Sequence, residues 1–340
     1  MIGRAATRLL DAPRFGPDET GLKAAVDALG GEVIRLRSRD GLKLTARWLP
    51  AETGFVAGDA AGEPAWQPDP YEAILLLHGW TGSVTPDLVE LGPTLRRTAG
   101  VLGLDFRGHG GSDDAPTTFG LYEIDDVAGA LAWLGERGIR RVALAGSSMG
   151  GAVAIASVVV LGDGSLVQAD LDPMAPAAAV DAPRPRIVAV VAESVAPDLR
   201  IPIANRMPLP IGGYLRRAFA GRMFTIAGRR VGGDLRAMEP GRIVGLVEPV
   251  PLLLIHGGAD RTVRPADGRR LAARAGPSTE HWEVPGADHG RARHAGAAQW
   301  DERVTRFLRL ALFGGREVMP IIHASGEPTA GSDFLEVVGD

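Results

Sequence analysis

The chain has 340 residues, 45% of them apolar and 23% charged, which is the composition of an ordinary globular protein with a sizeable core. Its net charge of −4 excludes the basic surface typical of nucleic-acid binding, and the absence of cysteine excludes disulfides, thiolate metal sites and a cysteine nucleophile. We expect a cytoplasmic protein without an integral membrane segment. The reason is that residues 1–16 lack the apolar core of a signal peptide, and no apolar run reaches the roughly 18 residues that span a bilayer.

The first part of the chain predicts short helices followed by a hairpin. Residues 1–30 have the character of a helical lead-in. Residues 32–37 and 43–49 alternate apolar and polar side chains on either side of Arg39-Asp40-Gly41, which is typical of two antiparallel strands joined by a tight turn. Residues 51–70 are rich in glycine, alanine, proline and aspartate, so we expect a surface loop there.

Apolar runs separated by helical patterns then predict a parallel sheet. Continuous apolar runs suit strands that are buried on both faces, and they occur at 73–78, 101–104, 141–145, 187–192 and 252–255. A shorter strand signal follows at 281–284, and helical periodicity covers 86–98, 122–137 and 149–161. Strands that alternate with helices imply right-handed crossovers. We therefore predict an α/β fold with a doubly wound, mostly parallel eight-stranded sheet.

Three stretches interrupt this rhythm. Residues 163–185 are rich in aspartate, proline and alanine and predict a loop insertion. Residues 197–248 contain short, arginine-rich amphipathic pieces between two predicted strands, so we expect a helical cap over the carboxyl edge of the sheet. Residues 313–340 show no clear period and predict a C-terminal tail. The predicted organisation is a single domain over residues 1–312, with the cap at about 197–248, followed by the tail.

The strongest motif is Gly146-Ser147-Ser148-Met149-Gly150. It follows an apolar strand and opens an apolar helix, which is the context of a G-x-S-x-G nucleophile elbow. A side chain at either glycine would clash with the neighbouring strand or helix. Ser148 would thus stand at the sheet edge, at a helix N-terminus that favours a developing anion. We predict Ser148 as the nucleophile.

A serine hydroxyl needs a base, and the base needs an orienting acid. Of the seven histidines, His289 lies in a loop after the last predicted strand, on the edge that carries the elbow. Asp260 follows another apolar strand and a glycine turn on that edge. The rival acids are Glu193, which we expect to line the site or to pack, and Asp288, which is too close in sequence to face the ring. The order Ser148, Asp260, His289 is that of α/β-hydrolases.

The remaining requirement is an oxyanion hole of backbone N–H groups, where the loss of one donor typically costs roughly 3–4 kcal/mol. We assign one donor to Met149, directly after the nucleophile. We assign the other to Trp80, in His78-Gly79-Trp80-Thr81-Gly82 after the third strand, where glycines allow a close backbone approach. The Trp80 side chain is a candidate for lining the pocket.

These motifs resemble the α/β-hydrolase superfamily, in the branch of monoglyceride-lipase-like and serine-aminopeptidase-like hydrolases. The matching pieces are LLLHGW, GLDFRGHGGSD, GSSMGG, PLLLIHGGADRTV and VPGADHG, and they imply coverage of about residues 32–312. The resemblance implies a cap between the sixth and seventh strands. It also implies a structural role for the loop that contains His109, which would otherwise be a candidate second base.

Together these features predict a serine hydrolase that cleaves a carboxylic ester through an acyl-enzyme intermediate. A peptidase, thioesterase, amidase or acyltransferase would use the same triad, and a non-catalytic binding protein on a hydrolase scaffold is the alternative from another class. The mechanism requires no metal and no cofactor, and no phosphate-loop, dinucleotide or zinc motif is present. The expected partner is a small-molecule ester or acyl substrate rather than a nucleic acid. The natural substrate, the acyl-chain length and the oligomeric state stay open.

Basic residues dominate the predicted cap. It contains nine arginines against four acids, and a functional interpretation is attraction for substrates that carry a carboxylate or phosphate. The simpler interpretation, which the sequence alone favours, is a solvated surface. The arginines are Arg200, Arg206, Arg216, Arg217, Arg222, Arg229, Arg230, Arg236 and Arg242.

Overall fold

The computed structural model describes residues 2–11, 14, 19–52, 68–80, 82–162, 184–208 and 210–313. Most of the predicted insertion at 163–185 and of the tail at 313–340 lies outside these residues, as does Thr81. The strands are β1 (Glu32–Arg37), β2 (Lys43–Leu49), β3 (Glu72–Leu77), β4 (Gly100–Leu104), β5 (Arg141–Ser147), β6 (Arg186–Glu193), β7 (Leu252–Gly257) and β8 (Thr279–Val284).

The eight strands form one sheet in the order β1-β2-β4-β3-β5-β6-β7-β8. Strand β2 runs antiparallel to β1 and to β4, and all the other pairs are parallel. The predicted α/β fold with a mostly parallel eight-stranded sheet is confirmed. Because β3 and β5–β8 are parallel, the loops that follow them meet at one edge of the sheet.

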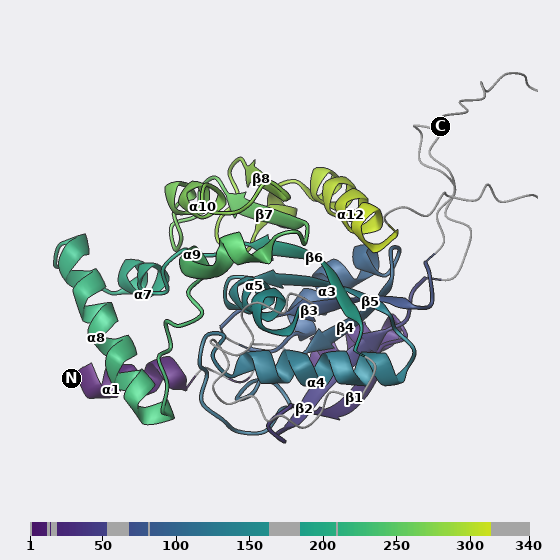
Figure 1. Cartoon of the computed structure of the whole chain (residues 1–340), viewed down its shortest axis with the longest axis horizontal. Coiled ribbons are helices and arrows are strands. Elements are labelled where there is room, and N and C mark those ends of the chain that lie inside the picture. The colour runs from purple at the N-terminus through teal and green to yellow at the C-terminus, as the bar shows by residue number, and fades with distance from the viewer. Residues whose placement is uncertain are drawn as a thin grey trace, which may run out of the picture.

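Helices cover both faces of the sheet (Figure 1). They are α1 (Ile2–Leu10), α2 (Glu19–Ala28), α3 (Thr85–Leu95), α4 (Glu123–Glu136), α5 (Met149–Leu161), α7 (Arg200–Arg206), α8 (Gly213–Val231), α9 (Pro240–Ile243), α10 (Pro265–Ala272), α11 (Ala292–Ala295) and α12 (Ala297–Phe313), with a 3-10 turn, η1 (Val244–Val247). Successive strand residues point to opposite faces. Leu75 and Leu77 thus join the core under α4 and α5, whereas Ile74 and Leu76 join the core under α3 and α12.

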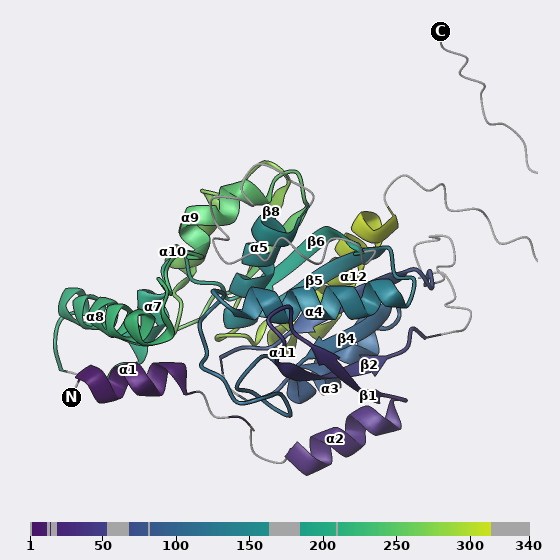
Figure 2. The ribbon, with the colours of Figure 1, turned by 60° about the horizontal axis from the view of Figure 1, so that its bottom comes forward.

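The segment between β6 and β7 contains α7, α8, α9 and η1, and we call residues 197–248 the β6–β7 insertion. Helix α8 extends away from the sheet, and helix α1 lies along α8 (Figures 1 and 2). The base of the insertion packs on the body, because Ile243, Val244 and Val247 are buried in the same core as α5.

Candidate active site

Ser148 lies at the turn between β5 and α5 in a strained backbone conformation, with φ +54° and ψ −112°. The two flanking glycines explain how so tight a turn fits. A Cβ on Gly146 would lie 2.5 Å from the carbonyl carbon of Gly150, and a Cβ on Gly150 would lie 2.1 Å from the carbonyl oxygen of Leu77. Since real Cβ atoms do not approach so closely, both positions require glycine.

The structure brings Ser148, His289 and Asp260 into one hydrogen-bonded chain. His289 Nε2 lies 3.0 Å from Ser148 Oγ, and His289 Nδ1 lies 2.8 Å from Asp260 Oδ2. Asp260 is buried, and its other oxygen accepts the backbone N–H groups of Thr262 and Val263, each at 2.8 Å. With Nδ1 donating to the carboxylate, Nε2 is left to accept the proton of the Ser148 hydroxyl.

The two rival carboxylates occupy other places. Asp288 is exposed and accepts the backbone N–H groups of His289 and Arg261, which hold the pKa of its carboxyl below its usual value. Glu193 accepts the backbone N–H of Ala292 at 2.9 Å. Within the described ranges, the only carboxylate that hydrogen-bonds the His289 ring is that of Asp260.

Glu193 borders a separate cavity of about 60 Å³, which also touches Asp87, Ser147 and Gly290. This cavity lies behind the elbow, and Ser148 does not line it. Burial raises the pKa of the Glu193 carboxyl to about 7, and burial together with the neighbouring charge of Glu90 raises the pKa of Asp87 to about 7 as well. The side chain of Glu193 therefore links the end of β6 to the loop of His289 rather than facing the space in front of Ser148.

The loop after β3 is held by two buried histidines. His78 Nε2 accepts the backbone N–H of Phe106 at 3.1 Å, so His78 Nδ1 carries the proton and donates to the carbonyl of Gly79 at 2.6 Å. Burial, with a contribution from His109, lowers the pKa of His78 to about 3 and keeps it neutral. His109 Nε2 lies 2.8 Å from the carbonyl oxygen of Trp80. Both peptide groups around Trp80 are thereby fixed.

This arrangement directs the two N–H groups that were predicted to form the oxyanion hole. In a trans peptide the N–H points opposite to the C=O. Because the carbonyl of Gly79 faces His78, the N–H of Trp80 points away from that ring. Met149 is the first residue of α5, where N–H groups have no partner within the helix. A Cβ on Gly79 would lie 3.9 Å from Ser148 Cβ, so the loop passes close to the elbow.

A small apolar chamber of about 40 Å³ opens at Ser148. An aromatic row connects its wall to the β6–β7 insertion: the ring centroids of Trp80 and Phe119 are 6.1 Å apart, and those of Phe119 and Phe224 are 5.5 Å apart. Trp80 is among the residues that line the chamber. The chamber is lined by Trp80, Phe119, Ser148, Met149, Ala152, Ala196, Leu199, Pro202, Ile203, Arg206 and Val263.

Two residues of the site, Ser194 and Phe119, were not predicted from the sequence. Ser194 has φ +55°, and its hydroxyl accepts the N–H of Gly290 at 3.0 Å, which holds the residue after His289. Phe119 has φ +57°. A positive φ in a residue other than glycine follows from the surrounding fold rather than from the local sequence. Only the position of Ser194, directly after an apolar strand that ends at the same sheet edge, could have indicated it.

In the described part of the chain, no group of three or more histidine, aspartate or glutamate side chains could hold a metal ion. No helix among the same residues is both long enough and apolar enough to cross a bilayer.

The fold and this sheet-edge geometry define a protein of the α/β-hydrolase class. A model of the alpha/beta hydrolase family matches residues 74–304, and the chain belongs to that family. It is 26% identical over 293 residues to the protein YfhR of Escherichia coli O157:H7, with 84% of this chain and 83% of YfhR covered.

Solved structures share the fold. The esterase Pf2001 of Pyrococcus furiosus is 23% identical, with a TM-score of 0.57 over 88% of this chain and 99% of that one. An alpha-beta hydrolase from Vibrio vulnificus is 17% identical, with a TM-score of 0.59 over 89% of this chain and 92% of that one. At these identities, the likeness concerns the fold.

Proposed function

We propose that this protein is a serine hydrolase that cleaves a carboxylic ester through an acyl-enzyme, with Ser148 as nucleophile, His289 as general base and Asp260 as the orienting acid. The observation that carries the proposal is the hydrogen-bonded chain Ser148 Oγ–His289 Nε2, at 3.0 Å, and His289 Nδ1–Asp260 Oδ2, at 2.8 Å. The strained elbow and the family membership support it.

In the proposed first step, the hydroxyl of Ser148 attacks the ester carbonyl while His289 takes its proton. Asp260 stabilises the imidazolium, and the N–H groups of Trp80 and Met149 stabilise the oxyanion. The imidazolium then gives its proton to the departing alkoxide, which leaves as the alcohol. A water, deprotonated in turn by His289, attacks the acyl-enzyme and releases the acid, so that Ser148 regains its proton.

The chamber at Ser148 supports a short acyl group. A cavity needs roughly 10–15 Å³ to hold one water, so the chamber of about 40 Å³ has room for a group as small as acetyl. An acetyl group therefore fits without movement of the β6–β7 insertion. Acetyl esters are the appropriate first substrates.

The test is labelling by a fluorophosphonate probe, together with hydrolysis of p-nitrophenyl acetate. We expect the native protein to be labelled and to turn over the ester, because the base-activated serine attacks both reagents. Ser148→Ala should abolish labelling and lower kcat by about 10⁴-fold or more, since the nucleophile is lost while the fold remains.

Ser147→Ala is the matched control, because it removes the hydroxyl of the neighbouring residue, which lines the cavity behind the elbow and not the chamber at Ser148. This variant should still be labelled at Ser148. Retained labelling and turnover in folded Ser148→Ala would disprove the assignment. A folded native protein that is neither labelled nor active would favour a non-catalytic binding protein on this scaffold. If only thioester or amide substrates are turned over, Ser148 remains the nucleophile, but the proposal that the substrate is an ester is wrong.

A further inference from the structure

A cavity of the β6–β7 insertion is basic. It has a volume of about 300 Å³ and lies between the end of α7, the start of α8 and the loop before α10. Among the described residues, no acidic side chain lines it. Its lining consists of Asn205, Gly213, Tyr214, Arg216, Arg217 and Arg264. Three arginines thus line one hollow, and two of them, Arg217 and Arg264, are exposed.

Three arginines of the insertion outside the cavity have a counter-ion, whereas the cavity arginines, like Arg206, Arg222, Arg229 and Arg230, form no ion pair with a described residue. Arg200 pairs with Asp198, and both Arg236 and Arg242 pair with Glu239. By contrast, none of the three cavity arginines forms an ion pair with any residue that the structure describes, and Nε of Arg216 is buried without a hydrogen-bond partner. Asp198 and Glu239 thus neutralise three arginines outside the cavity, and no described acid neutralises the arginines that line it.

The cavity adjoins the chamber at Ser148 across the last turn of α7. Asn205 lines the basic cavity, and the next residue, Arg206, lines the chamber. The loop after β7 fixes this turn, since Asn205 Nδ2 donates to the carbonyl of Thr262 at 2.9 Å. In the same loop, Val263 lines the chamber and Arg264 lines the cavity. At two places, therefore, consecutive residues line the basic cavity and the chamber: Asn205 with Arg206, and Arg264 with Val263.

We propose that this cavity binds an anionic group, a carboxylate or a phosphate, of an ester substrate whose acyl carbon is placed at Ser148. The proposal rests on the proposed esterase function and names the substrate class. Guanidinium groups bind such oxyanions through pairs of charge-assisted hydrogen bonds, and their geometry matches both carboxylate and phosphate. The apolar chamber takes the short acyl group, while the alcohol part carries the charge and reaches across the end of α7.

Matched ester series provide the probes. One series consists of O-acetyl ω-hydroxyalkanoic acids with two to ten carbons in the hydroxy acid, and its neutral counterparts are the N-methylamides of the same acids. A second series consists of ω-acetoxyalkyl phosphates. Each pair presents the same acetyl ester, so the ratio of kcat/KM for the anionic compound to that for the neutral one isolates the recognition of charge. Comparing the two series distinguishes a carboxylate from a phosphate ligand.

We expect this ratio to exceed about 10 at the chain length that spans the two spaces, and to fall for shorter chains. The variant Arg216→Gln with Arg217→Gln should lower the ratio at least tenfold, because it removes two of the three cavity cations. The control is Arg222→Gln with Arg229→Gln, which removes the same charge from exposed positions of α8 outside the cavity. The control should change the ratio less than threefold.

A binding measurement separates this proposal from the proposed chemistry. Octanoate and octyl phosphate are titrated calorimetrically into folded Ser148→Ala protein, with and without the Arg216→Gln and Arg217→Gln changes. Saturable binding that the cavity variant weakens at least tenfold supports the site even if no ester is turned over. The inference is overturned if the neutral probes are hydrolysed as well as the anionic ones. It is equally overturned if the control variant loses as much preference as the cavity variant, because the effect is then general electrostatic attraction that salt would screen.

Discussion

Two serines at the ends of neighbouring strands adopt left-handed backbone conformations, Ser148 with φ +54° and Ser194 with φ +55°. Each such conformation costs about 1–3 kcal/mol and persists where the surroundings hold it. The N–H of Ser148 donates to the carbonyl of Glu193, and the N–H of Ser194 donates to the carbonyl of Ile255, at 2.8 and 2.9 Å. Each strained serine is thus held by a hydrogen bond to the neighbouring strand, Ser148 by β6 and Ser194 by β7.

Glu193 is the residue from which we predict a pH effect. Its pKa is raised by burial from 4.5 to about 7, so the folded protein binds this proton more tightly than the unfolded chain does. The stabilisation is therefore complete below pH 4.5 and is lost as the pH rises toward 7. We expect Glu193→Gln, which keeps an oxygen for the N–H of Ala292, to gain stability relative to the native protein across this interval. The gain should be at least about 1 kcal/mol, measured by urea unfolding at pH 4.5 to 8.

Glu280→Gln is the control for this measurement. It removes a carboxylate that is 55% exposed and pairs with Arg303 at the surface, where ion pairs contribute little. The difference between this variant and the native protein should stay flat over the same pH range. If the Glu193→Gln difference is equally flat, the carboxyl of Glu193 is not protonated in the folded protein near neutral pH.

Individual side chains of the site were predictable to unequal degrees. The motif around Ser148 is local, so the sequence alone indicates it, and Asp260 and His289 follow from their places after apolar strands. The basic cavity is different: Asn205, Arg216 and Arg264 come from three elements, and nothing in the sequence indicates that they converge. The sequence therefore favoured a solvated surface for the arginines of the insertion.

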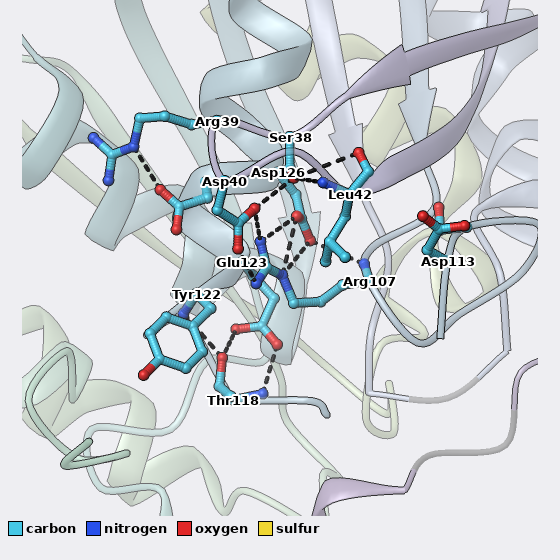
Figure 3. A network of polar contacts seen from close by, with 12 residues as sticks. Ser38, Arg39, Asp40, Leu42, Arg107, Asp113, Thr118, Tyr122, Glu123 and Asp126 are labelled. Atoms are coloured by element: carbon cyan, nitrogen blue, oxygen red, sulfur yellow. Dashed lines mark hydrogen bonds and ion pairs between the residues drawn. The ribbon is translucent and has the colours of Figure 1, made fainter. Parts of the chain in front are cut away.

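At the level of elements, a buried polar network fixes the loop after β4 (Figure 3). Arg107 donates to Asp126 of α4 at 2.7 Å and to Asp40 of the β1–β2 turn at 2.9 Å, and the Arg107 side chain is 4% exposed. In the same figure, Glu123 accepts from the hydroxyl and the N–H of Thr118. The network connects hairpin, helix and loop, and this loop carries the histidine that holds Trp80.

We predict that Arg107→Met destabilises the protein by about 3–5 kcal/mol, because the carboxylate of Asp126 is then buried without its cation. Arg107→Met combined with Asp126→Leu should recover at least half of the loss, since no buried charge remains. Chemical denaturation at pH 7 measures both. Arg97→Met is the control, because Arg97 pairs with Glu52 at an exposed site and should cost less than about 1 kcal/mol. Equal losses in Arg107→Met and Arg97→Met would contradict the buried-charge argument.

The predicted elements agree with the structure where one pattern dominates. The apolar run at 101–104 matches β4 within one residue, and the helix at 149–161 coincides with α5. Edge strand β8 begins at Thr279, two residues before the predicted start, because its pairing with β7 rather than its own apolarity fixes its length. Helix α12 was not predicted, although Trp300, Val304, Phe307 and Leu308 form a regular apolar stripe that indicates a helix.

At the level of the whole molecule, the N-terminal helix α1 packs against α8 of the β6–β7 insertion (Figure 2). Leu9 and Leu10 of α1 are buried, Arg230 of α8 donates to Thr7, and the carbonyl of Leu10 accepts the N–H of Thr117 at 2.8 Å. Helix α1 thus supports α8 at one end and the segment before Phe119 at the other. Because Phe119 and Phe224 pack together at the chamber, this support extends to the proposed active site.

We therefore predict that Leu9→Ala with Leu10→Ala loosens α8 while the sheet stays folded. Each buried leucine contributes about 1.5–3 kcal/mol by burial, so local opening of α8 should become at least tenfold more frequent. Limited digestion with trypsin, which cuts after the arginines at 216–230, measures this opening, and the same variant should hydrolyse p-nitrophenyl acetate more slowly. Arg4→Gln, at an exposed position of α1, should leave the digestion rate unchanged. If the double variant is cut in α8 no faster than Arg4→Gln, then the insertion holds α8 without α1, and the position of the helix depends on its other contacts.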